Sequence, residues 1–93
     1  MTFLYDFDII KKNERINVMK ELIIKLTNGQ DIRDFVNCVI LADYDVDLVQ
    51  GRYVIDAKSI MGIFSLDLLS PITLKAHTEN ADKLFEKIGK FAV

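Results

Sequence analysis

The side chains of this sequence that could take part in chemistry are few and lie far apart along the chain. His77 is the single histidine and Cys38 is the single cysteine. One histidine among scattered carboxylates does not form a metal-binding signature, so no metal or other cofactor is expected. Cys38 stands among apolar neighbours, which is typical of a small packed side chain. The sequence therefore predicts a protein without catalytic residues, and not an enzyme.

Two further polar side chains, Asp31 and Ser59, stand where helices are expected to begin. Asn28-Gly29 interrupts a preceding apolar alternation, and apolar residues then recur at helical spacing from Ile32 to Val39. A carboxylate such as that of Asp31 is favourable at the positive end of a helix. Ser59 is a good N-cap for the short apolar segment of residues 60–64. Both positions are therefore explained by helix capping alone.

The elements around these positions define the expected fold. Apolar and polar residues alternate over residues 21–27, 44–48 and 72–77, which predicts three strands. A fourth strand is predicted over residues 53–55, which resume extended character after a tight turn at Gln50-Gly51. Helical spacing predicts helices from near Asp31, over residues 60–64, and from an Asn80 cap through Ile88. The order is β-α-β-β-α-β-α. It indicates an open-faced α+β sandwich, in which a four-stranded antiparallel sheet carries three helices on one face.

Composition excludes several classes of function. The chain has 93 residues, of which 51% are hydrophobic and 28% charged, and its net charge is only -2. Such a chain folds as one small domain, and its dispersed basic residues do not favour a nucleic-acid partner. No apolar run approaches the roughly 20 residues of a membrane-spanning helix, and no signal peptide is recognised. With a single cysteine, the expected location is the cytoplasm.

Residues 1–18 are not needed by the predicted fold, which occupies residues 19–93. They begin with apolar and acidic residues in alternation and continue with a polar run over residues 11–15. Three interpretations are open for this segment: an extra strand, an arm through which the protein forms a homo-oligomer, or a disordered tail.

The segment around Ser59 carries a resemblance to a known family. Residues 56–66 read Asp56-Ala57-Lys58-Ser59-Ile60-Met61-Gly62-Ile63-Phe64-Ser65-Leu66. This stretch resembles the region around the regulatory serine of the HPr family, the phosphocarrier proteins of the sugar phosphotransferase system. The order of elements and the Ile72-Thr73-Leu74 strand also fit that family. The resemblance extends over about residues 19–93, and it implies the HPr-like form of the open-faced sandwich.

The resemblance also implies that this chain lacks the histidine that is phosphorylated in the family. In the family, a G-x-H-A-R-P segment places this histidine at a helix N-terminus, where an arginine steadies the phosphate. The corresponding residues here are Gly29-Gln30-Asp31-Ile32-Arg33-Asp34. Asp31 then takes the position of the histidine, Arg33 takes that of the arginine, and Asp34 replaces the proline. The chain resembles a divergent member, similar to the catabolite-repression paralogues of HPr that lack the histidine and keep the serine.

The resemblance implies a regulatory, protein-binding module and not a phosphocarrier. Ser59 would be phosphorylated by an HPr-type serine kinase, and the apolar residues Ile60, Met61, Ile63 and Phe64 would dock a regulatory target protein. Asp31, beside Arg33, is either a helix-capping residue or a permanent mimic of the phosphorylated state. Two alternatives are a phosphoryl carrier that uses Asp31 as the acceptor, and a structural module that oligomerises through residues 1–18.

Overall fold

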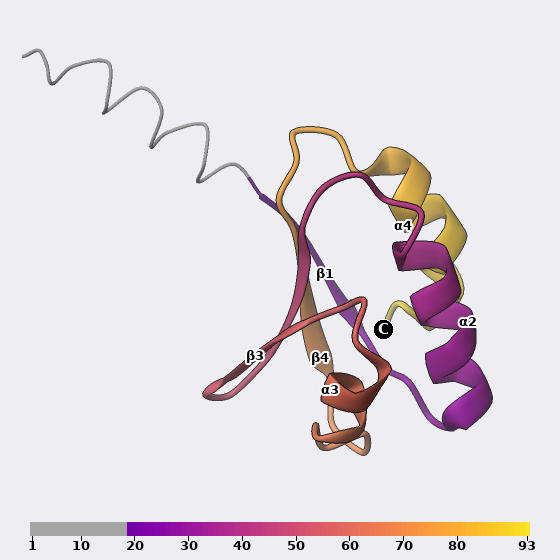
Figure 1. Cartoon of the computed structure of the whole chain (residues 1–93), viewed down its shortest axis with the longest axis vertical. Helices are drawn as coiled ribbons and strands as arrows, with labels where there is room; N and C mark the ends of the chain where they lie inside the picture. Colours follow the sequence, from indigo (N-terminus) through magenta and orange to yellow (C-terminus); the bar gives the residue numbers. More distant parts are fainter. Residues whose placement is uncertain (1–18) are drawn as a thin grey trace, which may run out of the picture.

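The structure is a computed structural model that describes residues 19–93, and the predictions for residues 1–18 lie outside this part of the chain. The order of strands and helices is as predicted (Figure 1). The strands are β1 (Lys20–Ile24), β2 (Val46–Gln50), β3 (Tyr53–Asp56) and β4 (Ile72–Ala76). The helices are α2 (Gly29–Val39), α3 (Ile60–Phe64) and α4 (Asp82–Ile88), followed by the 3₁₀ turn η1 (Gly89–Phe91).

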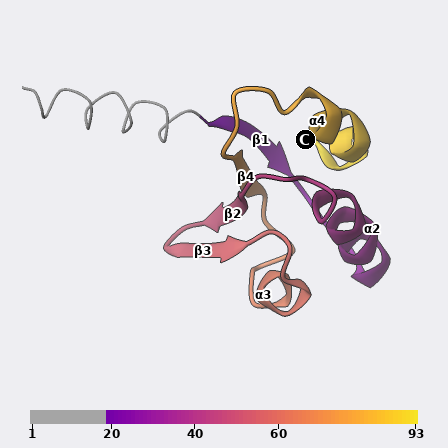
Figure 2. The ribbon, with the colours of Figure 1, turned by 45° about the horizontal axis from the view of Figure 1, so that its top comes forward.

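The four strands form one antiparallel sheet in the order β1-β4-β2-β3. Leu74 of the central strand β4 lies opposite Leu22 on one side and Leu48 on the other, and Leu48 lies opposite Ile55. Because side chains alternate between the faces of a strand, these four residues point to the same face. All three helices cover that face, with α2 and α4 side by side (Figures 1 and 2). The open-faced α+β sandwich with the HPr-like element order is therefore confirmed.

The core lies between this face of the sheet and the helices. The predicted apolar face of α2 is buried, since Ile32, Phe35, Val36 and Val39 are each no more than 5% exposed. The Phe35 ring packs against Phe91 of η1 edge to face, with ring centroids 6.1 Å apart. No buried polar or charged residue occurs within residues 19–93. Burial of apolar surface is therefore the main source of stability of this part of the chain.

The two edges of the sheet differ in how they are covered. The C-terminal residues run beside β1, where the Lys25 amide donates to the Phe91 carbonyl at 2.9 Å and the Val93 amide donates to the Ile23 carbonyl at 3.0 Å. β3 forms the opposite edge and reaches β2 through a tight turn at Gly51, whose φ of 60° is one that glycine adopts without strain. Across residues 19–93, the helices are too short or too polar to cross a membrane.

Two helix starts differ from the predictions. α2 begins at Gly29, two residues before Asp31, because Asn28 caps the helix and does not form a separate turn. α4 begins at Asp82, and the capping position belongs to Ala81, which makes no side-chain cap hydrogen bond. Asn80 still contributes there, since its Oδ1 accepts from the Asp82 amide at 2.9 Å. Asn80 therefore helps to close the start of α4 as predicted, whereas Asn28, predicted only as a break in the chain, is the N-cap of α2.

Candidate functional site

The N-terminus of α2 is closed by hydrogen bonds to two side chains, those of Asn28 and Asp31. Asn28 Oδ1 accepts a hydrogen bond from the Asp31 amide at 2.8 Å. Asp31 Oδ2 accepts from Thr27, the residue before the cap, through its amide at 3.1 Å and its hydroxyl at 2.6 Å. This arrangement resembles a capping box, in which side chains satisfy amides that the first helical turn leaves unpaired. Asp31 therefore lies in the first turn and stabilises the helix start, while Asn28 is the residue at the cap itself.

Asp31 is held in its ionised form. The hydrogen bonds from the Thr27 side chain and backbone, with a smaller contribution from the Lys90 ammonium, hold the pKa of the Asp31 carboxyl below its ordinary value. These interactions favour the charged carboxylate over the neutral acid. The negative charge lies at the positive end of the α2 dipole, where it is electrostatically favourable.

Arg33 does not pair with Asp31. Its Nη2 donates to Gln30 Oε1 at 3.3 Å, and Gln30 Nε2 donates to Asp34 Oδ1 at 2.9 Å. Asp34 is also 3.8 Å from Lys90 Nζ, which comes from η1. The guanidinium thus contacts Gln30 in place of Asp31. Asp31 and Asp34 place two carboxylates in the first turns of α2. Their negative charges would repel a phosphate that approaches this end of the helix.

His77 lies at the other end of the sheet. It directly follows β4, whose last residue Ala76 pairs with Lys20 at the start of β1, whereas α2 follows the end of β1. Its Nε2 is 2.8 Å from Asp47 Oδ2. Within residues 19–93, no group of three or more His, Cys, Asp or Glu side chains is placed to hold a metal ion. The one histidine of the sequence is therefore remote from the α2 N-terminus.

Ser59 is the N-cap of α3, as predicted. Its Oγ accepts from the Gly62 amide at 3.1 Å, and its backbone is extended with φ -100°. A Cβ added at Gly62 would lie 3.2 Å from Ser59 Oγ and 3.4 Å from Ile55 Cδ1. The contact with Ser59 Oγ would be tight, so glycine at this position leaves room for the capping hydroxyl. Ser59 itself is half-buried at the start of the helix.

The four apolar residues of α3 divide between surface and core. Met61 is 79% exposed, Phe64 53% and Ile60 38%. Ile63 is 0% exposed and belongs to the core, so its assignment to a docking surface is wrong. The reason is geometric, because a helix this short directs one side at the sheet and leaves the others to solvent. We use the term α3 surface for Ile60, Met61 and Phe64.

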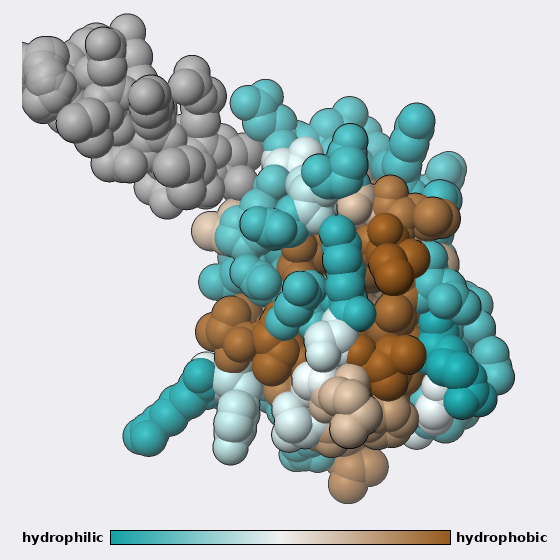
Figure 3. Space-filling view, in the orientation of Figure 1, coloured by the Kyte–Doolittle hydropathy of each residue, from teal (hydrophilic) through white to brown (hydrophobic). Residues whose placement is uncertain are grey.

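The α3 surface adjoins further exposed apolar residues that the sequence analysis did not single out. α2 and α3 are in contact, and Lys58 Nζ donates to the Ala42 carbonyl at 3.0 Å, which ties the start of α3 to the loop after α2. In that loop Leu41 is 71% exposed and Ile40 57%. Figure 3 shows apolar surface over α3 and over this loop. The signal in the sequence is the uninterrupted run of residues 39–42, which is too long for a single buried stripe.

The sheet order, the helices on one face and the capped helix after β3 define the class of protein as an HPr-like open-faced sandwich. A search of solved structures finds HPr proteins. HPr-C-His from Thermoanaerobacter tengcongensis is 23% identical with a TM-score of 0.64, over 76% of this chain and 88% of that chain. The phosphocarrier protein HPr from Bacillus anthracis str. Ames is 28% identical with a TM-score of 0.57, over 82% of this chain and 96% of that chain.

Comparisons at the level of sequence give no match. No protein-family model matches the chain. No curated protein matches it either. The likeness to HPr proteins is therefore a likeness of fold, accompanied by the local pattern of residues around Ser59.

The division of α3 into core and surface predicts different costs for two substitutions. Ile63→Ala should lower the free energy of unfolding by about 2–5 kcal/mol, because it removes a fully buried side chain and leaves a cavity. Met61→Ala should change it by no more than about 0.5 kcal/mol, because Met61 is largely exposed. Urea denaturation followed by circular dichroism measures both. Equal losses in the two variants would contradict the assignment.

The capping role of Asp31 predicts how stability depends on pH. Because its pKa is lowered in the folded protein, its contribution is present above the ordinary value of 3.8 and is lost as the pH falls through the folded pKa. Asp31→Asn should therefore be less stable than the parent protein near neutral pH, and the difference should shrink below about pH 4. Urea denaturation at several pH values tests this. Thr27→Val, which keeps the backbone hydrogen bond, should have a smaller effect, and a gap independent of pH would refute the role.

Proposed function

We propose that this protein is an HPr-like regulatory module related to the sugar phosphotransferase system, which binds partner proteins through the α3 surface and is switched by phosphorylation of Ser59. The observation that carries the proposal is the position of Ser59. It caps a helix whose Met61 and Phe64 project into solvent, on a fold whose neighbours are HPr proteins. A partner with an apolar groove would fit this surface, since exposed clusters of large apolar residues are typical of protein contacts.

Phosphorylation at Ser59 would change this surface without unfolding it. A serine kinase would transfer the terminal phosphoryl group of ATP to Ser59 Oγ, with loss of the hydroxyl proton and release of ADP. Ser59 Oγ acts as an acceptor from Gly62 in the cap, and phosphate oxygens are also acceptors, so the cap geometry is compatible with the modified residue. The added charge of about -2 would lie beside Ile60 and Met61 and favour a partner that presents arginine or lysine there.

The α2 N-terminus supports a regulatory role over a phosphocarrier role. Asn28 and Asp31, whose side chains close the helix start, are not histidines, and both are engaged in capping. As an acceptor, Asp31 would have to give up hydrogen bonds from Thr27 and accept a phosphate close to Asp34. Acyl phosphates on aspartate also depend on metal and further acidic ligands, for which residues 19–93 hold no candidate group. Oligomerisation through residues 1–18 stays a prediction, and no observation favours it.

Incubation with ATP and an HPr-type serine kinase should add one phosphoryl group to the full chain, and Ser59→Ala should abolish the gain. Intact-mass spectrometry measures this directly. Ser65→Ala is the matched control, because Ser65 lies at the other end of α3 and its hydroxyl donates to the Gly62 carbonyl. A phosphoryl group that persists in Ser59→Ala, or no gain in the parent protein, would be incompatible with the proposed switch.

The α3 surface should also contribute to recognition by that kinase. Met61→Ser combined with Phe64→Ser should raise the KM for the protein substrate about tenfold, because apolar anchors at the centre of an interface typically contribute more than 1 kcal/mol. Steady-state kinetics with the protein as the varied substrate gives this value. Val54→Thr, on the opposite face of the sheet and 64% exposed, is the control and should leave KM unchanged. If both variants behave alike, the docking surface lies elsewhere.

A further inference from the structure

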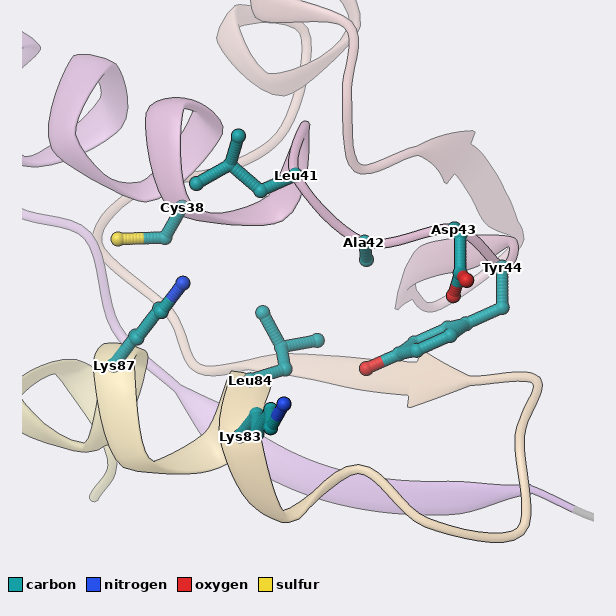
Figure 4. A pocket seen from close by; sticks show the side chains of 8 residues that line it. All are labelled: Cys38, Leu41, Ala42, Asp43, Tyr44, Lys83, Leu84 and Lys87. Carbon is teal, nitrogen blue, oxygen red and sulfur yellow. The ribbon is translucent and has the colours of Figure 1, made fainter.

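A cleft of about 250 Å³ opens between the loop after α2 and the side of α4 that faces it (Figure 4). Its walls come from the end of α2, from the loop that leads to β2, and from one side of α4. The lining residues are Cys38, Leu41, Ala42, Asp43, Tyr44, Lys83, Leu84 and Lys87. Neither Ser59 nor the residues of the α3 surface line it, so the function proposed above leaves this cleft unexplained.

The polar side chains of the cleft carry an excess of positive charge. Lys83 and Lys87 are one turn apart on α4 and both face the cleft. Asp43 is the single carboxylate among the lining residues. Among the ion pairs formed within residues 19–93, none involves Lys83 or Lys87. Lys58 adds a third ammonium nearby, since it donates to the carbonyl of Ala42. This local excess of cations contrasts with the net charge of -2 of the whole chain.

The remaining walls are apolar, apart from one hydroxyl. Leu84 is 4% exposed at the base, and Leu41 is 71% exposed at the mouth. The Tyr44 ring lies along the cleft with its hydroxyl directed toward α4 (Figure 4). Partial burial, with the charge of Asp43, raises the pKa of Tyr44, so this hydroxyl remains a hydrogen-bond donor at neutral pH. Apolar walls with a few convergent polar groups are the usual composition of a small-molecule site.

We propose that this cleft binds a small organic anion, a carboxylate or phosphate ester that carries a short apolar body. Lys83 and Lys87 attract the acid group, Tyr44 donates a hydrogen bond to it, and Leu41 and Leu84 contact the apolar part. The volume is below the roughly 300 Å³ at which typical ligand pockets begin, so the ligand is a small metabolite-sized molecule. The cleft is present with Ser59 unmodified, so binding does not require the proposed phosphorylation.

Phenyl phosphate is a suitable probe, because it combines the acid group with an apolar body. Titrated into the ¹⁵N-labelled full chain, it should cause saturable chemical-shift changes centred on residues 41–44 and 83–87. Inorganic phosphate has the acid group without the apolar body, and benzyl alcohol has the apolar body without the acid group. Each should bind at least about fivefold more weakly than phenyl phosphate. Equal affinity for inorganic phosphate, or changes scattered over all lysines, would overturn the proposal.

Substitutions on α4 test the charge requirement. Lys83→Gln combined with Lys87→Gln should weaken phenyl phosphate binding about five- to tenfold, as expected for two partly exposed charge interactions. Lys75→Gln removes a lysine from the opposite face of the sheet and should leave the affinity unchanged. The dispersion of the amide spectrum confirms that each variant is folded. An unchanged affinity in the double variant, or an equal loss in Lys75→Gln, would refute the site.

Cys38 provides an independent measurement on the unaltered protein. It is the single cysteine of the chain and lines the cleft, so its rate of alkylation by iodoacetamide reports on access to the cleft. Saturating phenyl phosphate should slow this alkylation several-fold, whereas benzyl alcohol at the same concentration should not. An alkylation rate that does not respond to phenyl phosphate would mean that the probe binds elsewhere.

Discussion

The register of β4 with its two neighbours is the constraint on which the rest of the structure depends. Leu74 lies between Leu22 and Leu48, and Ile55 extends the same apolar row to the edge strand. A shift of one residue in either pairing would turn this row toward solvent and remove the surface against which all three helices pack. The positions of α2 and α3, and hence of Asp31 and Ser59, follow from this row. The α2 N-terminus and the α3 surface are therefore held in place by residues that take no part in them.

Much of this fold could be predicted from the sequence, because its signals are local and agree with one another. The alternation at Ile72, Leu74 and Ala76 predicts a half-buried strand, and each of these residues is 0% exposed. Ser59 before a short apolar segment predicts a capped helix, and the Ser59–Gly62 hydrogen bond confirms it. In both cases a residue and its near neighbours contain the whole signal, so no knowledge of distant contacts is needed.

The errors arose where the outcome depends on tertiary contacts or on competition between neighbours. Asn28 and Asp31 can both cap a helix, and the sequence does not reveal that they do so together, with Thr27 as the third partner. Arg33 lies near Asp31 in the sequence, but Thr27 donates to that carboxylate and Gln30 accepts from the guanidinium. Ile63 could not be separated from its apolar neighbours on α3, because the position of the sheet decides which side of a short helix is buried.

The contact between Lys58 and the loop after α2 connects two surfaces that would otherwise be separate. Lys58 directly precedes Ser59, and its ammonium holds the Ala42 carbonyl at 3.0 Å. Ala42 lines the cleft beside α4, so this hydrogen bond joins the residue before the α3 cap to the wall of the cleft. A phosphate on Ser59 would compete with this carbonyl for the neighbouring ammonium, since a charged acceptor forms the stronger hydrogen bond. Any exchange of partners by Lys58 would then alter the loop at Ala42, and the α3 surface and the cleft would not be independent.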